Sequence, residues 1–374
     1  MIYRKFGNTG AEVSALGFGC MRFPMIKDGD KNIVDDEKAI PMLHYGIDNG
    51  INYVDTALFY CENQSEYTVG RALKDGYREK VYLATKCPIG DQSDAKFYRE
   101  TLETQLKKLD TPYIDFYHFH GISLDRFNNI VVKNDLLKEA IRAKDEGLIK
   151  HISFSFHDEA PAIKEIIDRA EIMESMLCQY NLMDRRNADY ITYAAEKGLG
   201  VTIMGPVGGG NLVEQSQIFH DMSQGNMTTV ELALKFVLSQ PGVSVALSGM
   251  ENMQMVQDNI EYVSRFTPLN ADEKVRVDKM LDEISEIAKL YCTGCDYCMP
   301  CPRGIKIPHL FNIMNLYRGY KLEARARERY RDVGEKEYAG APPSACVECG
   351  LCEKKCPQKI KIIEQLKEVE RTFG

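Results

Sequence analysis

The residues with the clearest chemistry are cysteines. The chain has 12 of them among 374 residues, and eight are gathered in two runs near the C-terminus. The second run, CVECGLCEKKCP, has the CxxCxxCxxxCP spacing that holds cubane iron–sulfur clusters, and the first, CTGCDYCMPCP, has one residue fewer before its last cysteine. The spacing predicts two 4Fe-4S clusters. Their predicted ligands are Cys292, Cys295, Cys298, Cys301, Cys346, Cys349, Cys352 and Cys356.

The assignment of these cysteines to clusters follows from their order, because the distant fourth cysteine of such a run normally serves the other cluster. The predicted sets are Cys292, Cys295 and Cys298 with Cys356, and Cys346, Cys349 and Cys352 with Cys301. The shorter first run leaves open which cluster Cys301 serves, but it hardly affects the number of clusters. Two zinc sites are the alternative, although zinc sites use two CxxC pairs instead of a run of three followed by Cys-Pro.

A second group of reactive side chains stands at the ends of apolar, β-prone runs earlier in the chain. DTALFY places Asp55 five residues before Tyr60. Two later runs end at Lys86 and at His120. Each residue alone has an ordinary explanation, as a turn cap, a packing group, a surface lysine or a core histidine. At the ends of parallel barrel strands, however, all four would meet at one mouth, so their joint placement predicts an active site.

The elements that would position these residues alternate short β-prone runs with longer segments of helical period. Eight such units predict an α/β fold, a (β/α)8 TIM barrel, whose usual length of about 250 residues fits the first 265. An open doubly wound sheet is the alternative. The predicted strands cover residues 14–20, 51–57, 81–87, 114–120, 150–156, 175–182, 201–207 and 243–250.

Three further segments complete the predicted architecture. Residues 3–14 carry GNTG between two short β-prone runs, which predicts a hairpin that could plug the lower end of the barrel. An apolar stripe predicts a helix over residues 94–109, and a charged amphipathic pattern predicts another over 271–290. The expected domains are therefore a barrel over residues 1–270, a linker helix over 271–290 and an iron–sulfur domain over 291–374.

Composition limits the class of protein. Hydrophobic residues make up 44% and charged residues 27%, as in soluble globular proteins. A net charge of -8 disfavours binding to nucleic acid or to an anionic membrane surface. The N-terminus lacks the pattern of a secretory signal, and no run reaches the length of a membrane span. We therefore expect a cytoplasmic protein whose partners are a small molecule or another protein, and whose cysteines serve metal or redox chemistry.

The residues around the four candidate side chains resemble those of the aldo-keto reductases. The resemblance rests on NYVDTALFY, YLATK, RETLETQLKKLDTPYIDFYHFH, GLIKHISFSF, QYN and VALSGM, over roughly the first 265 residues. The tail resembles the two-cluster ferredoxin appendage of one branch of that family, which implies a small α-helical ferredoxin-like domain. The resemblance also implies a catalytic tetrad of Asp55, Tyr60, Lys86 and His120. It makes His118, one layer deeper on the same strand face, a core or supporting residue.

The implied tetrad reduces a carbonyl group with a nicotinamide cofactor. Tyr60 would donate the proton, and the Lys86 ammonium would lower the phenol's pKa from its usual value near 10. Asp55 would hold Lys86 in place and keep it charged, while His120 would orient the substrate carbonyl. The implied enzyme is an NAD(P)-dependent oxidoreductase that acts on a small carbonyl or alcohol substrate.

Family correspondence also implies where the cofactor binds. Ser155 and Gln179 would lie near the nicotinamide carboxamide, and Met204 stands where many relatives stack an aromatic residue. The contacts implied for the adenosine half are Ser248, Gly249, Met250, Gln254, Asp258 and Asn259. Relatives selective for NADPH place Lys and Arg in this stretch, whereas this chain has Gly249 and Met255 there and adds Glu251. We therefore predict weak NADPH selectivity or a preference for NADH.

The two predicted parts handle different numbers of electrons, because hydride transfer moves two at once and a cluster moves one. The clusters could exchange electrons with a substrate or with an electron-transfer protein, or they could be structural or redox-sensing. The alternative functions are a nucleotide-sensing subunit and a pure electron carrier. An intact tetrad favours the enzyme.

Overall fold

The computed structural model describes residues 1–29, 31–289, 298–356 and 359–374. The chain forms two compact units, and the second includes a segment from the middle of the sequence. The first unit contains Met1–Gly210 and Ala233–Pro268, and the second contains Asn211–Leu232 and Leu269–Gly374. In the described part of the chain, no helix combines the length and the apolar character needed to cross a membrane.

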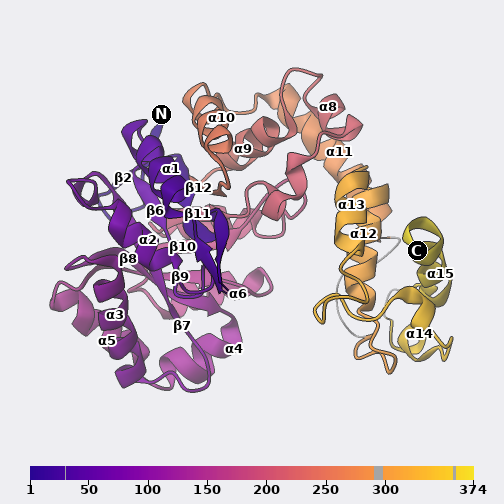
Figure 1. Ribbon diagram of the computed structural model, residues 1–374, viewed down its shortest axis with the longest axis horizontal. Helices are drawn as coiled ribbons and strands as arrows, with labels where there is room; N and C mark the ends of the chain where they lie inside the picture. Colours follow the sequence, from indigo (N-terminus) through magenta and orange to yellow (C-terminus); the bar gives the residue numbers. More distant parts are fainter. Residues whose placement is uncertain (30, 290–297, 357–358) are drawn as a thin grey trace. The chain divides into compact units, whose positions relative to one another are not determined.

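Eight parallel strands close into a barrel in the first unit (Figure 1). They follow one another around the barrel in sequence order, which confirms the (β/α)8 prediction and excludes the open sheet. The strands are β3 (Leu16–Gly19), β6 (Tyr53–Asp55), β7 (Tyr82–Pro88), β8 (Ile114–Ile122), β9 (Ile149–Phe156), β10 (Ser175–Gln179), β11 (Gly200–Met204) and β12 (Val243–Gly249). Each lies within or overlaps one predicted run, and their carboxyl ends share one mouth.

Helices follow the strands and lie outside the barrel (Figure 1). The first unit contains α1 (Asp36–Asp48), α2 (Ser65–Ala72), α3 (Ala95–Leu109), α4 (Leu124–Arg126), α5 (Leu136–Asp145), α6 (Pro161–Arg169), α7 (Ala188–Glu196) and α10 (Met253–Ser264). Helix α9 (Thr229–Ser239) runs from the second unit into the first. Short 3-10 or π turns cover Cys20–Arg22, Arg78–Lys80, Phe127–Val132, Gly208–Val213 and Pro343–Ala345.

Helix α3 shows why a predicted segment becomes a helix. The Asp94 side chain accepts a hydrogen bond from the Phe97 amide at its first turn, which satisfies a donor that the helix itself leaves open. Tyr98, Leu102 and Leu109 are buried on one face, as their spacing predicts. The helix therefore packs its apolar stripe toward the barrel and leaves its charged side outward.

The N-terminal hairpin closes the lower end of the barrel. Strands β1 (Tyr3–Lys5) and β2 (Glu12–Ser14) pair antiparallel, and the Phe6 side chain between them is fully buried. Its ring lies 4.8 Å from the Phe116 ring and 5.6 Å from the Tyr53 ring, centroid to centroid. Gly7 has φ +55°, and a Cβ there would lie 2.3 Å from the Gly198 carbonyl oxygen. The hairpin is thus a plug, as predicted.

A second hairpin was not expected from the sequence. Strands β4 (Met25–Asp28) and β5 (Lys31–Val34) pair antiparallel in the loop that follows β3. The Asn32 side-chain amide donates to Glu62, and the Gln64 side chain bonds to the backbone of Asn32 and Val34. The hairpin is therefore fastened to the segment that carries Tyr60. Its sequence signal is the Asp-Gly pair at residues 28–29, which is typical of tight hairpin turns.

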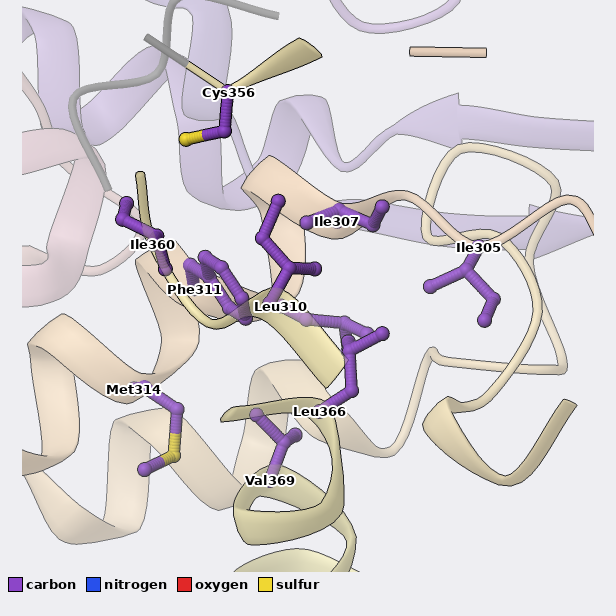
Figure 2. Packing of buried hydrophobic residues seen from close by; sticks show 10 residues of the cluster. Ile305, Ile307, Leu310, Phe311, Met314, Cys356, Ile360, Leu366 and Val369 are labelled. Atoms are coloured by element: carbon purple, nitrogen blue, oxygen red, sulfur yellow. The ribbon is translucent and has the colours of Figure 1, made fainter. Parts of the chain in front are cut away.

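The described part of the second unit is built mainly from helices. They are α8 (Gln217–Met222), α11 (Ala271–Lys289), α12 (Ile307–Arg318), α13 (Glu323–Tyr330), α14 (Leu351–Lys355) and α15 (Ile362–Phe373). Figure 2 shows its small apolar core, in which Phe311 and Leu310 of α12 face Leu366 of α15 and Ile360. The Glu214 carboxylate accepts hydrogen bonds from two amides at the start of α13. This contact explains why residues 211–232 belong to the second unit.

Candidate active site

The four tetrad candidates come from three neighbouring strands and one loop. Asp55 is the last residue of β6, Tyr60 lies in the loop after it, Lys86 lies in β7 and His120 lies near the end of β8. Because β6, β7 and β8 are adjacent and parallel, residues distant in sequence reach the same end of the barrel. The structure brings all four side chains together at this end of the barrel.

A buried ion pair forms the base of the site. Lys86 Nζ donates to Asp55 Oδ1 at 2.6 Å and to the Thr56 carbonyl oxygen at 2.8 Å. Both charged side chains are only 1% exposed. Burial lowers the pKa of Lys86, but Asp55 and Tyr60 raise it more strongly together, so the net shift is upward. Lys86 therefore stays protonated at neutral pH, held by the partner that compensates for its loss of water.

Tyr60 and His120 lie above this pair. Lys86 Nζ is 4.8 Å from the centre of the Tyr60 ring, and the Tyr60 and His120 rings contact edge to face with centroids 6.5 Å apart. Burial, followed by the positive charge of Lys86, lowers the pKa of His120 to about 3. His120 is therefore a neutral imidazole at physiological pH, able to donate a hydrogen bond without carrying charge.

The expected pKa shift of Tyr60 is wrong in sign. The sequence predicts that Lys86 lowers the pKa of Tyr60, whereas in the structure the net shift of this pKa is upward. Burial is the largest cause, since it disfavours the phenolate, and Lys86 opposes it only in part. Tyr60 thus keeps its proton at neutral pH, and the stabilisation by Lys86 matters for the phenolate that remains after the proton has left.

His118 occupies the deeper layer expected for it. It is 1% exposed, lies opposite Lys86 in the register of β7 and β8, and has its pKa lowered to about 3 by burial and by Lys86. His120, two residues along the strand, is the histidine whose ring contacts Tyr60. The strand therefore presents one histidine to the mouth and buries the other below it.

The residues expected around the nicotinamide lie at or next to the last positions of three consecutive strands, β9, β10 and β11. Ser155 is 1% exposed, and its hydroxyl oxygen accepts from the Gly121 amide at 2.8 Å, which leaves the hydroxyl proton free to donate. Gln179 is exposed, and its side-chain amide donates to Asp184 at 3.3 Å. Met204 is half-buried at the end of β11. A free hydroxyl donor and an exposed amide fit a carboxamide, which has both an acceptor and a donor.

The residues expected around the adenosine half gather where β12 leads into α10. Asn259 donates to the Ser248 hydroxyl at 3.0 Å, and both side chains are buried. Gln254 donates to Asp258 one turn away. Met250 is fully buried, so it contributes through packing.

Arg22 is a neighbour of this region that the sequence analysis missed. Its guanidinium donates to Glu251 at 3.1 Å and to the Gly209 carbonyl oxygen at 3.0 Å. A Cβ at Gly249 would lie 3.2 Å from the Arg22 side chain, so glycine makes room for it. These contacts join the loops after the first, seventh and eighth barrel strands. The one available signal was the position of Arg22 just after the first strand.

The described cluster cysteines lie close together in the second unit. One cavity is lined by Cys298, Cys301, Cys346, Cys349 and Cys352. Cys356 is buried and belongs to the same apolar cluster as Ile360 (Figure 2). Cys292 and Cys295 lie outside the described residues. A cavity lined by five thiols has the donor set that iron–sulfur clusters require, and it includes the four cysteines assigned to one cluster.

Comparison with known proteins gives the family. The model of the aldo/keto reductase family matches residues 15–282, and that of a 4Fe-4S dicluster domain matches residues 291–360. An uncharacterized oxidoreductase of Bacillus subtilis is 28% identical over 69% of this chain and 90% of its own. An L-galactose dehydrogenase of Arabidopsis thaliana is 26% identical over 76% and 95%.

Solved structures agree. An aldo-keto reductase from Bacillus halodurans in its holo form has a TM-score of 0.63 and 28% identity, over 75% of this chain and 96% of its own. One from Klebsiella pneumoniae in complex with NADP and acetate has a TM-score of 0.61 at 23% identity, over 74% and 94%, and shares the fold. With a family model covering most of its length, the chain belongs to the aldo/keto reductase family of oxidoreductase enzymes and carries a C-terminal 4Fe-4S dicluster domain.

Proposed function

We propose that the barrel reduces a small carbonyl compound to an alcohol, or catalyses the reverse oxidation, with NADH or NADPH. The observation that carries this proposal is the buried Asp55–Lys86 pair at 2.6 Å, directly beside Tyr60. A protonated phenol next to a fixed positive charge, with a neutral imidazole alongside, is an arrangement that can protonate an oxygen as negative charge develops on it.

The roles of the four residues follow from their charges. When bound, the nicotinamide cofactor supplies a hydride to the carbonyl carbon. Tyr60 donates its proton to the carbonyl oxygen, and Lys86 stabilises the phenolate that is left. His120, neutral in this site, donates a hydrogen bond that orients the carbonyl. Asp55 keeps Lys86 charged and in place, so its effect on the substrate passes through Lys86.

The proposed cofactor site uses the residues that line this end of the barrel. Ser155, Gln179 and Met204 hold the nicotinamide half. Ser248, Gly249, Met250, Gln254, Asp258 and Asn259 hold the adenosine half. The contact of Arg22 with Glu251 supports the predicted preference for NADH, because the Glu251 carboxylate both engages the nearby guanidinium and repels a phosphate.

For the C-terminal part we propose two 4Fe-4S clusters that carry single electrons to or from a substrate or an electron-transfer protein. The cavity lined by Cys301, Cys346, Cys349 and Cys352 supports this set as the ligands of one cluster. The second cluster would use Cys292, Cys295, Cys298 and Cys356. The proposed domains are the barrel at 1–270, the connecting helix at 271–290 and the cluster domain at 291–374. Such clusters and free thiols suit a reducing cytoplasm.

The decisive test of the enzymatic proposal is Tyr60→Phe. It removes the proton donor and keeps the ring, so we expect kcat for aldehyde reduction to fall by about 10²–10⁴-fold while the Kd of NADH changes little. The measurements are steady-state kinetics and a fluorescence titration with NADH. Tyr67→Phe, at an exposed tyrosine of α2, is the matched control. A nucleotide sensor predicts unchanged NADH binding with no turnover in the wild type.

A second experiment tests whether the two parts exchange electrons. The protein is purified without oxygen, its iron and sulfide are counted, and NADH is added while the cluster absorbance is followed. Bleaching by NADH supports electron exchange between the barrel and the clusters. If the cluster absorbance is unchanged by NADH but is bleached by a reduced ferredoxin, the barrel and the clusters do not exchange electrons. The clusters would then exchange electrons with a partner protein.

A further inference from the structure

A cavity opens beside His120 on the loops that follow β8 and β9. It has a volume of about 500 Å³ and is lined by Gly121, Ser123, Arg126 and His157. Gly121 is the residue next to His120, and the Gly121 amide donates to Ser155, one of the proposed nicotinamide contacts. The cavity therefore adjoins the place where the carbonyl group would react.

Arg126 brings a positive charge to this cavity that the protein does not neutralise locally. Its Nη1 donates to the Gly121 carbonyl oxygen at 2.9 Å. Among the residues that the structure describes, no carboxylate lies within ion-pair distance of the Arg126 guanidinium. Both nearby aspartates are engaged elsewhere, since Asp125 accepts from Asn129, and Asp158 accepts from the amides of Leu124 and Glu159. An exposed guanidinium of this kind keeps donors available for an anion.

Two neutral donors stand beside the guanidinium. The Ser123 hydroxyl oxygen accepts from the Arg126 amide at 3.1 Å, so its proton remains available to donate. The His157 backbone amide donates to the Ile122 carbonyl oxygen at 2.9 Å, which places this residue next to the end of β8. Burial, Lys86 and Arg126 lower the pKa of His157, so its ring is neutral and can donate one hydrogen bond.

The cavity and the tetrad also share one electrostatic environment. After burial, the groups that lower the pKa of His120 are Lys86, His157 and Arg126 in that order. Two positive groups, Lys86 and Arg126, thus act on His120, and Asp55, the acid at the base of the site, is already paired with Lys86. Such a field attracts a negatively charged substrate and disfavours a cationic one.

We propose that the preferred substrate is a carbonyl compound that carries a carboxylate, and that Arg126 binds this carboxylate in the cavity with Ser123 and His157 as neutral donors. The planar fork of arginine matches a carboxylate with two parallel hydrogen bonds. The reacting carbonyl then reaches Tyr60 and His120. The inference rests on the carbonyl reduction proposed above, and it adds the class of substrate.

The test compares two aldehydes that differ in the acid group, succinic semialdehyde and butanal, with NADH as the reductant. We expect the wild type to show at least about a tenfold higher kcat/KM for succinic semialdehyde, since one charge-assisted pair is lost with butanal. Arg126→Gln should lower kcat/KM for succinic semialdehyde, mainly through KM, about ten times more than it lowers kcat/KM for butanal. Arg126→Lys should recover part of the loss.

A matched control and a binding measurement complete the test. Arg169→Gln, an exposed arginine of α6 whose side chain bonds to Asn128, should leave both substrates unaffected. Calorimetry with succinate, which cannot react, should show binding to the wild type and at least a tenfold weaker affinity in Arg126→Gln. Circular dichroism verifies that each variant is folded.

The outcomes separate this inference from the proposed function. If the wild type reduces butanal but does not prefer the acid, or if Arg126→Gln affects both aldehydes equally, the carboxylate site is wrong and the reductase stands. If the wild type reduces neither aldehyde while Arg126-dependent succinate binding is present, the reductase proposal fails and the anion site stands. Absence of succinate binding overturns the inference whatever the activity.

Discussion

The barrel mouth and the cluster domain are built in opposite ways. At the mouth, side chains as far apart in sequence as Asp55 and His120 meet because neighbouring parallel strands end at the same place. In the cluster domain, the first three thiols of each run have only two residues between neighbours and need little folding to approach one another, while the fourth ligand of each predicted cluster comes from the other run. At the barrel mouth the fold assembles the site, whereas in the cluster domain we expect the bound clusters to stabilise the fold.

The packing of the second unit supports this contrast. The barrel floor is a dense cluster of large side chains around Phe6 and Phe116. The core of the cluster domain is small. It includes the buried Cys356 at its edge (Figure 2), and Cys298, Cys301, Cys346 and Cys352 pack against it. Ligand bonds formed there would supply folding free energy that the apolar core alone does not.

Removal of iron should have the strongest consequence, and it should affect the two units differently. A chelator with a mild oxidant should abolish the protection of α12 and α15 from hydrogen exchange, while β6 to β8 keep theirs. Hydrogen exchange followed by mass spectrometry measures both units at once. In parallel, Cys346→Ala should lose roughly half of the iron and Cys61→Ala none. Retained protection of α12 and α15 without iron would refute the contrast.

Lys86→Met tests how much the buried Asp55–Lys86 ion pair contributes to the stability of the barrel. The variant leaves Asp55 charged and buried without a partner, which is expected to lower the free energy of unfolding by about 3–5 kcal/mol. The double variant Asp55→Asn with Lys86→Met removes both charges and should recover most of that loss without recovering activity. Urea unfolding measures the difference. Equal stabilities of the single and double variants would contradict the buried ion pair.

A smaller effect is expected on the pH dependence of the free energy of unfolding. The folded barrel holds His118 neutral, with its pKa lowered to about 3 from the usual 6.5, so below pH 6.5 only the unfolded chain takes up the proton. The free energy of unfolding should therefore fall as the pH falls toward 3, by about 1 kcal/mol between pH 6.5 and 5.5, and should change by less than about 0.5 kcal/mol above 6.5 on this account. Urea unfolding at three pH values measures it.

Two variants distinguish the titration of His118 from a general loss of packing. His118→Leu should flatten part of that slope, with His120 and His157 keeping another part, since their pKa values are lowered as well. Phe116→Leu, a buried neighbour that does not titrate, should lower stability by the same amount at every pH. A slope that His118→Leu leaves unchanged would show that another group controls the acid sensitivity.

The smallest expected effect concerns the cofactor. Glu251→Gln frees Arg22 from its exposed ion pair and removes a carboxylate, so kcat/KM with NADPH should rise about threefold, with NADH changing less. Glu261→Gln, an exposed acid of α10 paired with Arg265, is the control. A wild-type kcat/KM for NADPH about a hundredfold above that for NADH would overturn the predicted cofactor preference.

The parts of the molecule that could be predicted from the sequence depend on short-range patterns. The eight strand runs, the plug around Gly7 and the helix after Asp94 all have local signals, and the structure confirms them. The hairpin at residues 25–34 has such a signal in its Asp-Gly turn, but its strands are short and β4 is exposed throughout, so periodicity did not mark it.

The electrostatics and the loop contacts were predicted less well. The sign of the Tyr60 pKa shift depends on how completely the ring is buried, which proximity to Lys86 does not reveal. Arg22 and Arg126 are surface arginines by any sequence criterion, and only the folded loops place one against Glu251 and the other beside His120.

The sequence by itself determined the family, the barrel and the metal chemistry, because strand periodicity, strand-end residues and cysteine spacing are local properties of the chain. Tertiary structure alone decided which charges are compensated and which remain open to a ligand. Burial and loop packing determine whether each charge has a partner, and both arise from contacts between residues that are far apart in the sequence.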